Sequence, residues 1–247
     1  MSAPLELSLV VPVYNERDNL PILVEEIGRA LAGRRDEGRY EIVAVDDGST
    51  DGSLDHLPSN GVLVLRNSAN QGIGAAMKRV CEYALEREYG VLVIQAGNDK
   101  DDPNEIPRLI EPILAGEADF VQGSRFLPGG GYGNTPAYRI LATRYFHPLL
   151  FSAAVGKRVT ETTNGFRAFR TALLRDPRIR WRQDWLNQYE LEPYLLYQAI
   201  KLGYRHCEVP VTKIYPPHAQ GYTKMRPIIG WWSILRPIIL LGLGLRK

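Results

Sequence analysis

The stretch Val91-Leu92-Val93-Ile94-Gln95-Ala96-Gly97-Asn98-Asp99-Lys100-Asp101-Asp102-Pro103 decides the fold. Its first four residues are apolar and mostly β-branched, which is typical of a buried parallel strand. Three aspartates then follow within four residues, and the proline suits the first turn of a helix. Acidic residues at the carboxyl end of a parallel strand face the crevice where open α/β sheets bind ligands. They could hold Mg²⁺ or Mn²⁺ together with substrate phosphates, or they could form a solvated turn that caps the next helix.

The composition is that of an ordinary soluble globular protein, with 45% hydrophobic and 23% charged residues. A length of 247 residues suits one large domain or one domain with an appendage. The net charge of +2 gives no sign of nucleic-acid binding, so we expect no nucleic-acid partner. Cys81 and Cys207 have no metal-ligand spacing, and we expect reduced thiols in a cytoplasmic protein. Residues 1–6 show no signal-peptide pattern.

Strand and helix patterns alternate through the first half of the chain. Short apolar runs predict strands at 7–13, 40–45, 62–65, 91–94 and 120–125. Apolar residues at helical spacing fill the segments 20–31, 72–88 and 106–114. This alternation predicts an α/β fold with a mostly parallel central sheet and helices on both of its faces.

Polar loops follow three of the predicted strands, at Tyr14 to Glu16, Asp46 to Asp51 and Gly97 to Asp102. If those strands are neighbours, the three loops meet in one cleft. Each aspartate alone could equally be a helix cap, above all Asp51 and Asp102.

A pair of glycines, Gly72 and Gly74, precedes the predicted helix at 72–88. The spacing is neither that of a dinucleotide-binding fingerprint nor that of a P-loop. It indicates a tight strand-to-helix turn or, alternatively, the close approach of a ribose or diphosphate.

The second half of the chain changes character. Segment 128–136 is rich in glycine and proline and predicts an irregular loop, either a lid or a surface connection. Segment 140–155 predicts a mostly apolar helix, and 162–170 predicts a polar turn followed by a strand. A further helix is expected at 189–202 and a further strand at 205–211.

The tail, residues 227–247, is apolar, but Arg236 and Pro237 interrupt it, and neither half is long enough to span a bilayer. Its tryptophans and flanking basic residues suit a peripheral contact with a membrane interface. The alternative is a helix that packs on the protein's own core or on the partner of a homodimer. We therefore expect one domain at 1–226 and an amphipathic tail after it.

Several motifs, in this order and spacing, resemble the family 2 glycosyltransferases, which are inverting enzymes with the GT-A fold. Within that family the chain looks most like the dolichol-phosphate mannose synthase branch, and the resemblance covers about residues 7–226. The motifs are Val11-Pro12-Val13-Tyr14-Asn15-Glu16, Val45-Asp46-Asp47-Gly48-Ser49-Thr50-Asp51-Gly52-Ser53, Asn70-Gln71-Gly72-Ile73-Gly74-Ala75-Ala76, Gly123-Ser124-Arg125, Asn164-Gly165-Phe166-Arg167 and Glu208-Val209-Pro210-Val211.

The resemblance implies a set of residues that bind the nucleotide sugar. These are Pro12, Tyr14, Glu16, Val45, Asp46, Asp47, Gly74, Asn98, Asp99, Arg125, Thr223 and Lys224. Asp46 or Asp47 would contact the base, and Arg125 would face the diphosphate-sugar or the acceptor phosphate. Thr223 and Lys224 belong to a segment similar to the family's Gly-x-Ser-Lys loop, which closes over the diphosphate. The catalytic residues implied are Asp99, Arg125, Glu190 and Glu192.

The metal motif departs from that of the family, which is Asp-x-Asp. Anchored on the prolines that follow, Gly97 replaces the first acid, Asp99 keeps the second, and Asp101 stands where the family has a glutamine. The resemblance therefore implies a Mg²⁺ or Mn²⁺ ion on Asp99 and Asp101, because Mg²⁺ needs only one or two carboxylates plus substrate phosphates. Alternatively, Lys100 offsets part of the phosphate charge.

The expected reaction is transfer of a sugar from a nucleotide-diphosphate sugar to an acceptor, and the acceptor that the sequence favours is a polyprenyl phosphate. A hydroxyl acceptor usually needs a carboxylate base, whereas a phosphate acceptor is already anionic. The region before the late helix has no clean Glu-Asp pair, although Asp184, Glu190 or Glu192 could serve as base. The alternatives are a soluble glycosyltransferase acting on a small-molecule hydroxyl and a nucleotide-sugar-binding protein without turnover. We expect a cytoplasmic location, with peripheral contact on the cytoplasmic face of a membrane.

Overall fold

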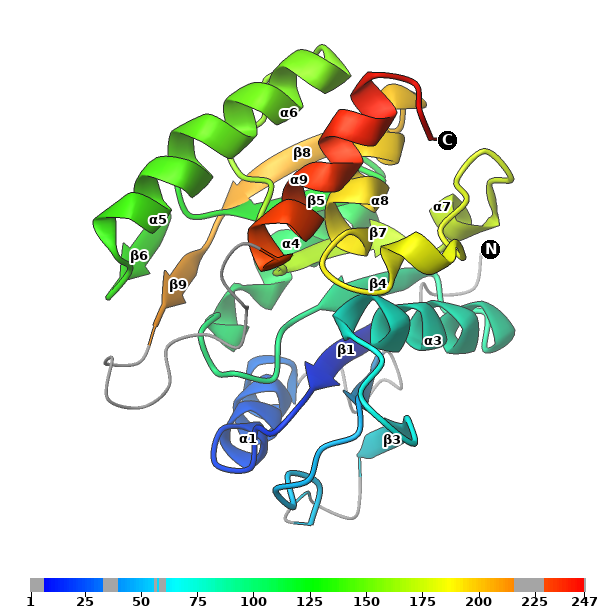
Figure 1. The fold of residues 1–247 in the computed structure, drawn as a ribbon. Helices are drawn as coiled ribbons and strands as arrows, with labels where there is room; N and C mark the ends of the chain where they lie inside the picture. The colour runs from blue at the N-terminus through cyan, green and yellow to red at the C-terminus, as the bar shows by residue number, and fades with distance from the viewer. Residues whose placement is uncertain (1–6, 33–39, 56, 58–60, 216–228, 247) are drawn as a thin grey trace.

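A computed structural model describes residues 7–32, 40–55, 57, 61–215 and 229–246 of the chain (Figure 1). The strands are β1 Leu7–Val13, β2 Tyr40–Asp46, β3 Val62–Arg66, β4 Val91–Ile94, β5 Phe120–Ser124, β6 Gly131–Gly133, β7 Arg167–Arg170, β8 His206–Pro210 and β9 Thr212–Ile214. The α-helices are α1 Leu20–Ala30, α3 Ile73–Glu86, α4 Ile106–Leu114, α5 Ala137–Leu141, α6 His147–Val155, α7 Ala172–Arg175, α8 Leu191–Lys201 and α9 Ile229–Gly242. Two 3₁₀ turns, η1 Pro103–Glu105 and η3 Asp184–Leu186, and one π-helical turn, η2 Ala142–Phe146, complete the described elements.

The central sheet has seven strands in the order β3-β2-β1-β4-β7-β5-β8. All neighbours run parallel except β7, which lies antiparallel between β4 and β5. Alternate residues of each inner strand enter two different cores, so Val10 and Ile94 pack on one side while Leu9 and Val93 pack on the other. Helices α1 and α4 cover one face, and α3 and α8 cover the opposite face (Figure 1). The predicted α/β fold with a mostly parallel sheet is confirmed.

Part of the glycine-rich segment is a strand, so the prediction of an irregular loop at 128–136 is wrong there. Strand β6 pairs in parallel with β9 in a separate two-stranded sheet. Its small residues permit this pairing: a Cβ at Gly133 would lie only 3.2 Å from a side-chain carbon of Ile214. The helix predicted at 140–155 begins earlier and consists of α5, the π-helical turn η2 and α6 in succession.

The tail helix α9 packs against α6 and α8. Its residues Ile234, Ile238 and Leu241 are buried in the core, whereas Trp232 is half exposed on the other side of the helix. The expectation that the tail packs on the protein's own core therefore holds for one face of α9. The expected boundary between 226 and 227 lies outside the described residues. None of the helices described has the length and apolar character needed to cross a bilayer.

One buried histidine joins α6 to α9 and should make folding sensitive to acid. His147 contacts the hydroxyl of Thr162 through Nδ1 at 2.6 Å and the carbonyl of Ile234 through Nε2 at 3.3 Å. Burial lowers the pKa of His147 from 6.5 to about 4. The unfolded chain therefore binds the proton first as the pH falls below 6.5, and the folded state loses stability down to about pH 4.

We predict that protonation linked to His147 alone lowers the free energy of unfolding by about 2 kcal/mol between pH 7 and pH 5. Urea unfolding followed by circular dichroism at both pH values measures this loss. His147→Gln should lower stability at pH 7 but reduce the pH dependence by about that amount. An unchanged pH dependence in this variant would show that His147 is not the titrating group.

Candidate active site

Three loops meet at the carboxyl ends of β1, β2 and β4, as predicted, because these strands are neighbours in the sheet. They border a cavity of about 1240 Å³. Its described wall includes Tyr14 to Asn19 after β1, Asp47 after β2, and Gly97 and Asn98 after β4. Residues of α8 and the first turns of α9 form the opposite wall. The cavity is therefore large enough for two substrates of moderate size.

Hydrogen bonds tie the loops after β1 and β2 together before any ligand arrives. The backbone N–H of Asn15 donates to the Ser49 hydroxyl at 2.9 Å, and the Asn15 side chain accepts from the Thr50 N–H at 2.9 Å. The N–H of Glu16 donates to the Ser53 hydroxyl at 2.8 Å. This end of the cavity is thus preformed, which lowers the entropic cost of binding a ligand there.

Pro12, Tyr14, Glu16, Asp47 and Asn98 line the cavity, so the structure brings together five of the residues expected to bind the nucleotide sugar. Tyr14 is partly exposed, in keeping with a ring that is accessible to a ligand. The other described members of that predicted set are not in the cavity wall.

Of the two aspartates expected near the base, Asp47 faces the cavity and Asp46 does not. Asp46 accepts a hydrogen bond from the Ser49 N–H at 2.9 Å and lies 3.3 Å from the Arg66 guanidinium, so it shapes the loop. Val45 is fully buried in the core and acts by packing.

Asp47 also fixes the turn before α3. One carboxylate oxygen accepts from the Gln71 N–H at 3.0 Å, and the other accepts from the Gly72 N–H at 2.8 Å. Gly72 has a φ of +101°, and a Cβ at Gly74 would lie 2.1 Å from the Leu186 carbonyl oxygen. The backbone of residues 186–188 lies close to both glycines. This favours a tight strand-to-helix turn, rather than the approach of a ribose or diphosphate, as the reason for Gly72 and Gly74.

The carboxylates expected to hold a metal ion do not form the described wall of the cavity. The Asp99 backbone has a φ of +50°, and its side chain is exposed to solvent. The protein around the carboxyl group still removes part of its solvation, and this loss together with the nearby Glu26 carboxylate raises the pKa of Asp99. Asp101 is buried and lies 2.6 Å from the Lys213 Nζ. The buried Asn98 Oδ1 and Asp101 Oδ1 have no hydrogen-bond partner, yet only Asn98 lines the cavity, and its amide oxygen is neutral.

A divalent cation bridging substrate phosphates needs at least one carboxylate that faces those phosphates. Among the residues that the structure describes, no group of three or more histidine, cysteine or acidic side chains is arranged to hold a metal. Asp99 and Asp101 in these positions do not fit the ion that the sequence motif implies, so we assign no step to it.

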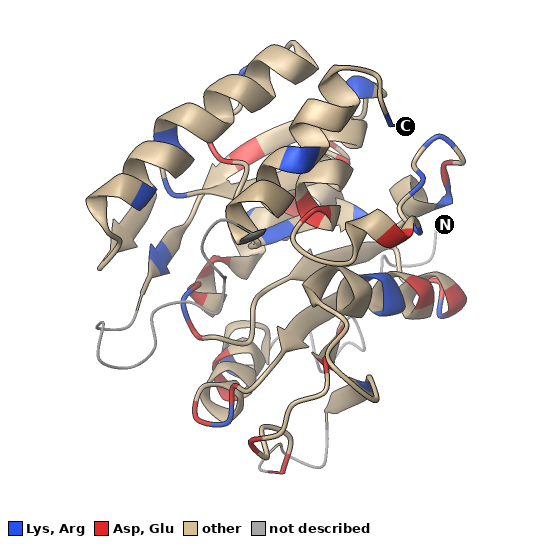
Figure 2. Cartoon of the chain, viewed as in Figure 1, with Lys and Arg blue, Asp and Glu red and all other residues tan. Residues whose placement is uncertain are grey.

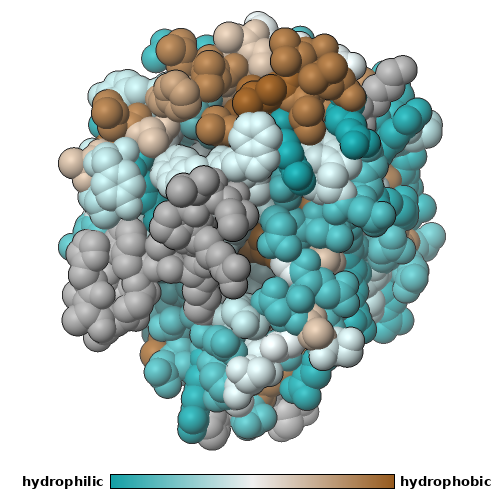
Figure 3. Space-filling model, in the orientation of Figure 1, coloured by the Kyte–Doolittle hydropathy of each residue, from teal (hydrophilic) through white to brown (hydrophobic). Residues whose placement is uncertain are grey.

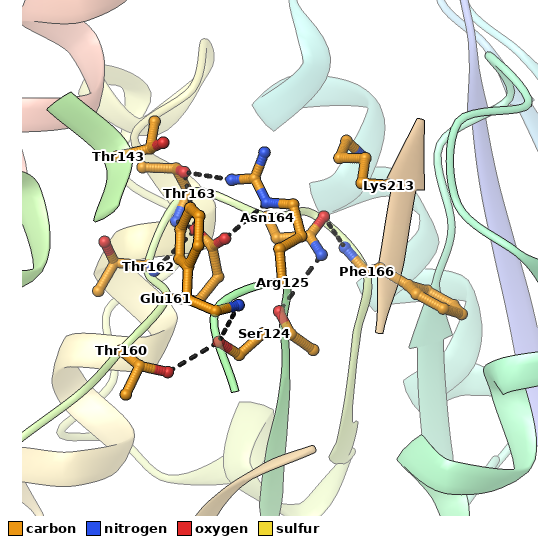
Figure 4. A network of polar contacts seen from close by, with 12 residues as sticks. Ser124, Arg125, Thr143, Thr160, Glu161, Thr162, Thr163, Asn164, Phe166 and Lys213 are labelled. Atoms are coloured by element: carbon orange, nitrogen blue, oxygen red, sulfur yellow. Dashed lines mark hydrogen bonds and ion pairs between the residues drawn. The ribbon is translucent and has the colours of Figure 1, made fainter. Parts of the chain in front are cut away.

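Arg125 does not face the cavity, which corrects the position predicted for it. Its guanidinium is buried and lies 2.7 Å from a carboxylate oxygen of Glu161. It also donates to the Thr163 hydroxyl at 3.2 Å (Figure 4). Because Thr162 and Thr163 do line the cavity, Arg125 holds a part of the wall in place.

The two glutamates expected to be catalytic differ in position. Glu190 is buried, its pKa is raised by burial, and its carboxylate lies 2.7 Å from the Arg236 guanidinium of α9. Glu192 lines the cavity, with its carboxylate 3.7 Å from the buried Arg167. Only Glu192 is thus in a position to act on a bound substrate. Asp184, the other candidate base, is exposed in η3.

The cavity wall includes Arg139, Lys213 and Tyr215, which the sequence analysis did not assign to the site. The cation Lys100 also lines it, beside the Tyr215 ring. Lys213 lies two residues after the Glu208-Val209-Pro210-Val211 motif, and a basic residue so close to that motif is a signal that could have been used. Thr223 and Lys224 lie outside the described residues, and their role stays a prediction.

Comparisons with known proteins agree with this geometry. The model of the family "Glycosyl transferase family 2" matches residues 8–177. Polyprenol monophosphomannose synthase of Mycolicibacterium smegmatis is 32% identical over 224 residues, which are 88% of this chain and 80% of that protein. Undecaprenyl-phosphate mannosyltransferase of Micrococcus luteus is 30% identical, over 82% of this chain and 81% of that protein.

A solved structure shares the fold at 19% identity and a TM-score of 0.67, covering 97% of this chain and 78% of the other. It is glucosyl-3-phosphoglycerate synthase of Mycobacterium tuberculosis, solved with Mn²⁺, uridine diphosphate and phosphoglyceric acid. The expected GT-A fold is thereby confirmed. Given the family match over most of its length, the chain belongs to glycosyl transferase family 2 and is a glycosyltransferase.

Proposed function

We propose that this glycosyltransferase moves a sugar from a nucleotide-diphosphate sugar to a polyprenyl phosphate at a membrane surface. The observation that carries the proposal is the composition of the cavity wall. The loops after β1 and β2 form one end, and Gly230, Ser233 and Ile234 of the apolar helix α9 form part of another. A donor nucleotide and the head of a lipid can thus share one space. The names of the relatives from M. smegmatis and M. luteus support a polyprenyl acceptor.

The proposed chemistry is a single displacement at the anomeric carbon. An oxygen of the acceptor phosphate forms the new bond to that carbon, while the bond to the donor's phosphate oxygen breaks and its electron pair leaves with the nucleoside diphosphate. The acceptor is already an anion, so no proton has to be removed. The residues of this chain therefore have to orient the two substrates and to stabilise the negative charge on the leaving group.

An apolar face borders the cavity and offers a route for the lipid. It comprises the exposed side chains Tyr138, Leu141, Tyr145, Phe146, Leu149 and Leu150 of the α5–α6 segment together with Trp232, Ile239, Leu243 and Leu245 of α9 and its end. Figure 3 shows apolar residues gathered at the top of the molecule, over α6 and α9. Neither segment carries an acidic residue, and basic residues lie along both (Figure 2). Such a surface suits the interface of an anionic bilayer.

The proposed location is the cytoplasmic face of a membrane, in peripheral contact. Cys81 and Cys207 are both free, in keeping with a reducing compartment. The alternative partner for this apolar face is a second copy of the chain. Sedimentation in the absence of lipid would then show a dimer whose population rises with protein concentration.

A second candidate function has one observation in its favour, the carboxylate of Glu192 in the cavity wall. With a small-molecule hydroxyl as acceptor, this carboxylate is placed to remove the hydroxyl proton. The two candidates therefore differ in whether catalysis needs a base.

We predict that purified protein transfers sugar to undecaprenyl phosphate in detergent and that Glu192→Gln keeps this activity within about tenfold. The amide retains the shape of the side chain, whereas loss of a general base typically costs about 10²–10⁴-fold. Transfer to lipid, measured by thin-layer chromatography with a panel of labelled nucleotide sugars, gives the result. Thermal unfolding of the variant controls for loss of the Arg167 contact. Transfer only to hydroxyl acceptors, abolished in Glu192→Gln, would establish the second candidate instead.

We also predict that the protein floats with vesicles that contain anionic lipid and that the variant Leu149→Glu/Trp232→Glu binds them about tenfold more weakly or worse. Each change places a charge where the apolar face meets the bilayer. Ile22→Glu is the matched control, because Ile22 is 50% exposed on α1, which covers the opposite face of the sheet. Equal flotation of the two variants would contradict the assignment of this face.

A further inference from the structure

The loop after β4 is tightly packed against β1 at its first turn. The Gly97 N–H donates to the Pro12 carbonyl at 3.1 Å, which holds the loop against β1. A Cβ at Gly97 would lie 3.0 Å from that carbonyl oxygen and 3.3 Å from a Val11 methyl carbon. An aspartate at this point would be tightly packed, and the Pro12 carbonyl would have to give by a few tenths of an ångström. Gly97 therefore follows from the packing of the loop as well as from the sequence.

The remaining acids of the same loop are not among the described residues that line the cavity. Asp101 forms its buried ion pair with Lys213, and Asp102 accepts from the Asn104 N–H at 2.9 Å, which caps η1. Asp99 is exposed on the side of Glu26. The loop thus contributes no anionic oxygen to the described wall of the cavity.

Cationic side chains occupy this part of the wall instead. Lys100 comes from the loop after β4, Lys213 from β9 and Arg139 from α5, and all three line the cavity. Around Tyr215, the Lys100 Nζ lies 4.7 Å and the Arg139 Cζ 5.2 Å from the ring centroid. Lys100 and Arg139 thus converge on Tyr215, and Lys213, which is paired with Asp101, lies in the same cavity wall.

Backbone contacts join the two segments that carry Lys100 and Lys213. The Ile214 N–H donates to the Lys100 carbonyl at 2.9 Å, and Asp101 forms an isolated antiparallel bridge with Lys213. The loop after β4 is therefore held against strand β9. An ammonium group has three N–H donors, so Lys213 can donate to a phosphate as well as to Asp101.

We propose that Lys100, Lys213 and Arg139 bind the diphosphate of the donor and neutralise the leaving nucleoside diphosphate, in the role that a divalent cation has with an Asp-x-Asp motif. The inference rests on the proposed function, because it takes the donor to be a nucleotide-diphosphate sugar. Ammonium and guanidinium groups form strong charge-assisted hydrogen bonds to phosphate oxygens. Fixed charges at the point where negative charge develops stabilise the transition state without reorganisation.

Calorimetric titration of the full chain with UDP, GDP, ADP and CDP tests this inference. We predict that one of these nucleotides binds with the same affinity in EDTA as in Mg²⁺ or Mn²⁺. Lys100→Met and Arg139→Gln should each weaken its binding by about tenfold or more, because each removes a charged hydrogen bond to phosphate. Binding of the corresponding nucleoside should not change. Asp99→Asn should bind the nucleotide as the unmodified chain does.

Lys201→Met is the matched control, because Lys201 is an exposed lysine that also lies over a tyrosine ring, 6.0 Å from the Tyr197 centroid, but outside the cavity wall. Lys213→Met alone leaves Asp101 buried without its partner, so the double variant Lys213→Met/Asp101→Asn is used. Thermal unfolding of this variant checks that it is still folded. Binding that disappears in EDTA and in Asp99→Asn or Asn98→Ala, but survives in Lys100→Met, would overturn the inference and leave the proposed function standing. Failure of every nucleotide to bind would overturn both.

Discussion

The buried ion pair between Asp101 and Lys213 determines where the loop after β4 lies. Its atoms are 2.6 Å apart, and it joins residues 112 positions apart in the sequence. Removing one partner of a buried pair leaves an uncompensated charge, at a cost of about 3–5 kcal/mol. The pair therefore keeps the loop on β9, keeps Asp101 away from a bound substrate and places Lys100 at the cavity. The charge that the loop after β4 presents to the cavity follows from this contact.

The tail helix is a structural part of the site. Its buried face packs on α6 and α8, its first turns form cavity wall, and its Arg236 pairs with Glu190 at 2.7 Å. The Arg236 guanidinium also contacts the Trp185 carbonyl, next to the segment that packs on Gly74. A contact between the apolar face and a bilayer would therefore act on a helix that is already fastened to the active-site wall. In this arrangement the lipid head and the donor would meet without a large rearrangement of the described fold.

Local sequence patterns predicted the elements with the strongest periodicity. The apolar runs at 7–13 and 91–94 coincide with β1 and β4, and the polar loops after them do converge. Contacts between distant segments could not be read in this way. The antiparallel insertion of β7, the pairing of β6 with β9 and the Arg125–Glu161 pair each depend on partners far along the chain. The family resemblance placed Arg125 at the diphosphate-sugar or the acceptor phosphate, because a motif identifies a residue but not the carboxylate that lies beside it.

The most direct measurement is a crystal structure of the chain with its tightest-binding nucleoside diphosphate, grown with Mn²⁺ and recorded at a wavelength where manganese scatters anomalously. We predict that the phosphate oxygens lie within hydrogen-bond distance of Lys100, Lys213 and Arg139, with no manganese peak beside them. A manganese peak that bridges the phosphates to Asp99 or Asn98 would contradict the role given to these cations. It would show that the divergent motif still works as a metal site.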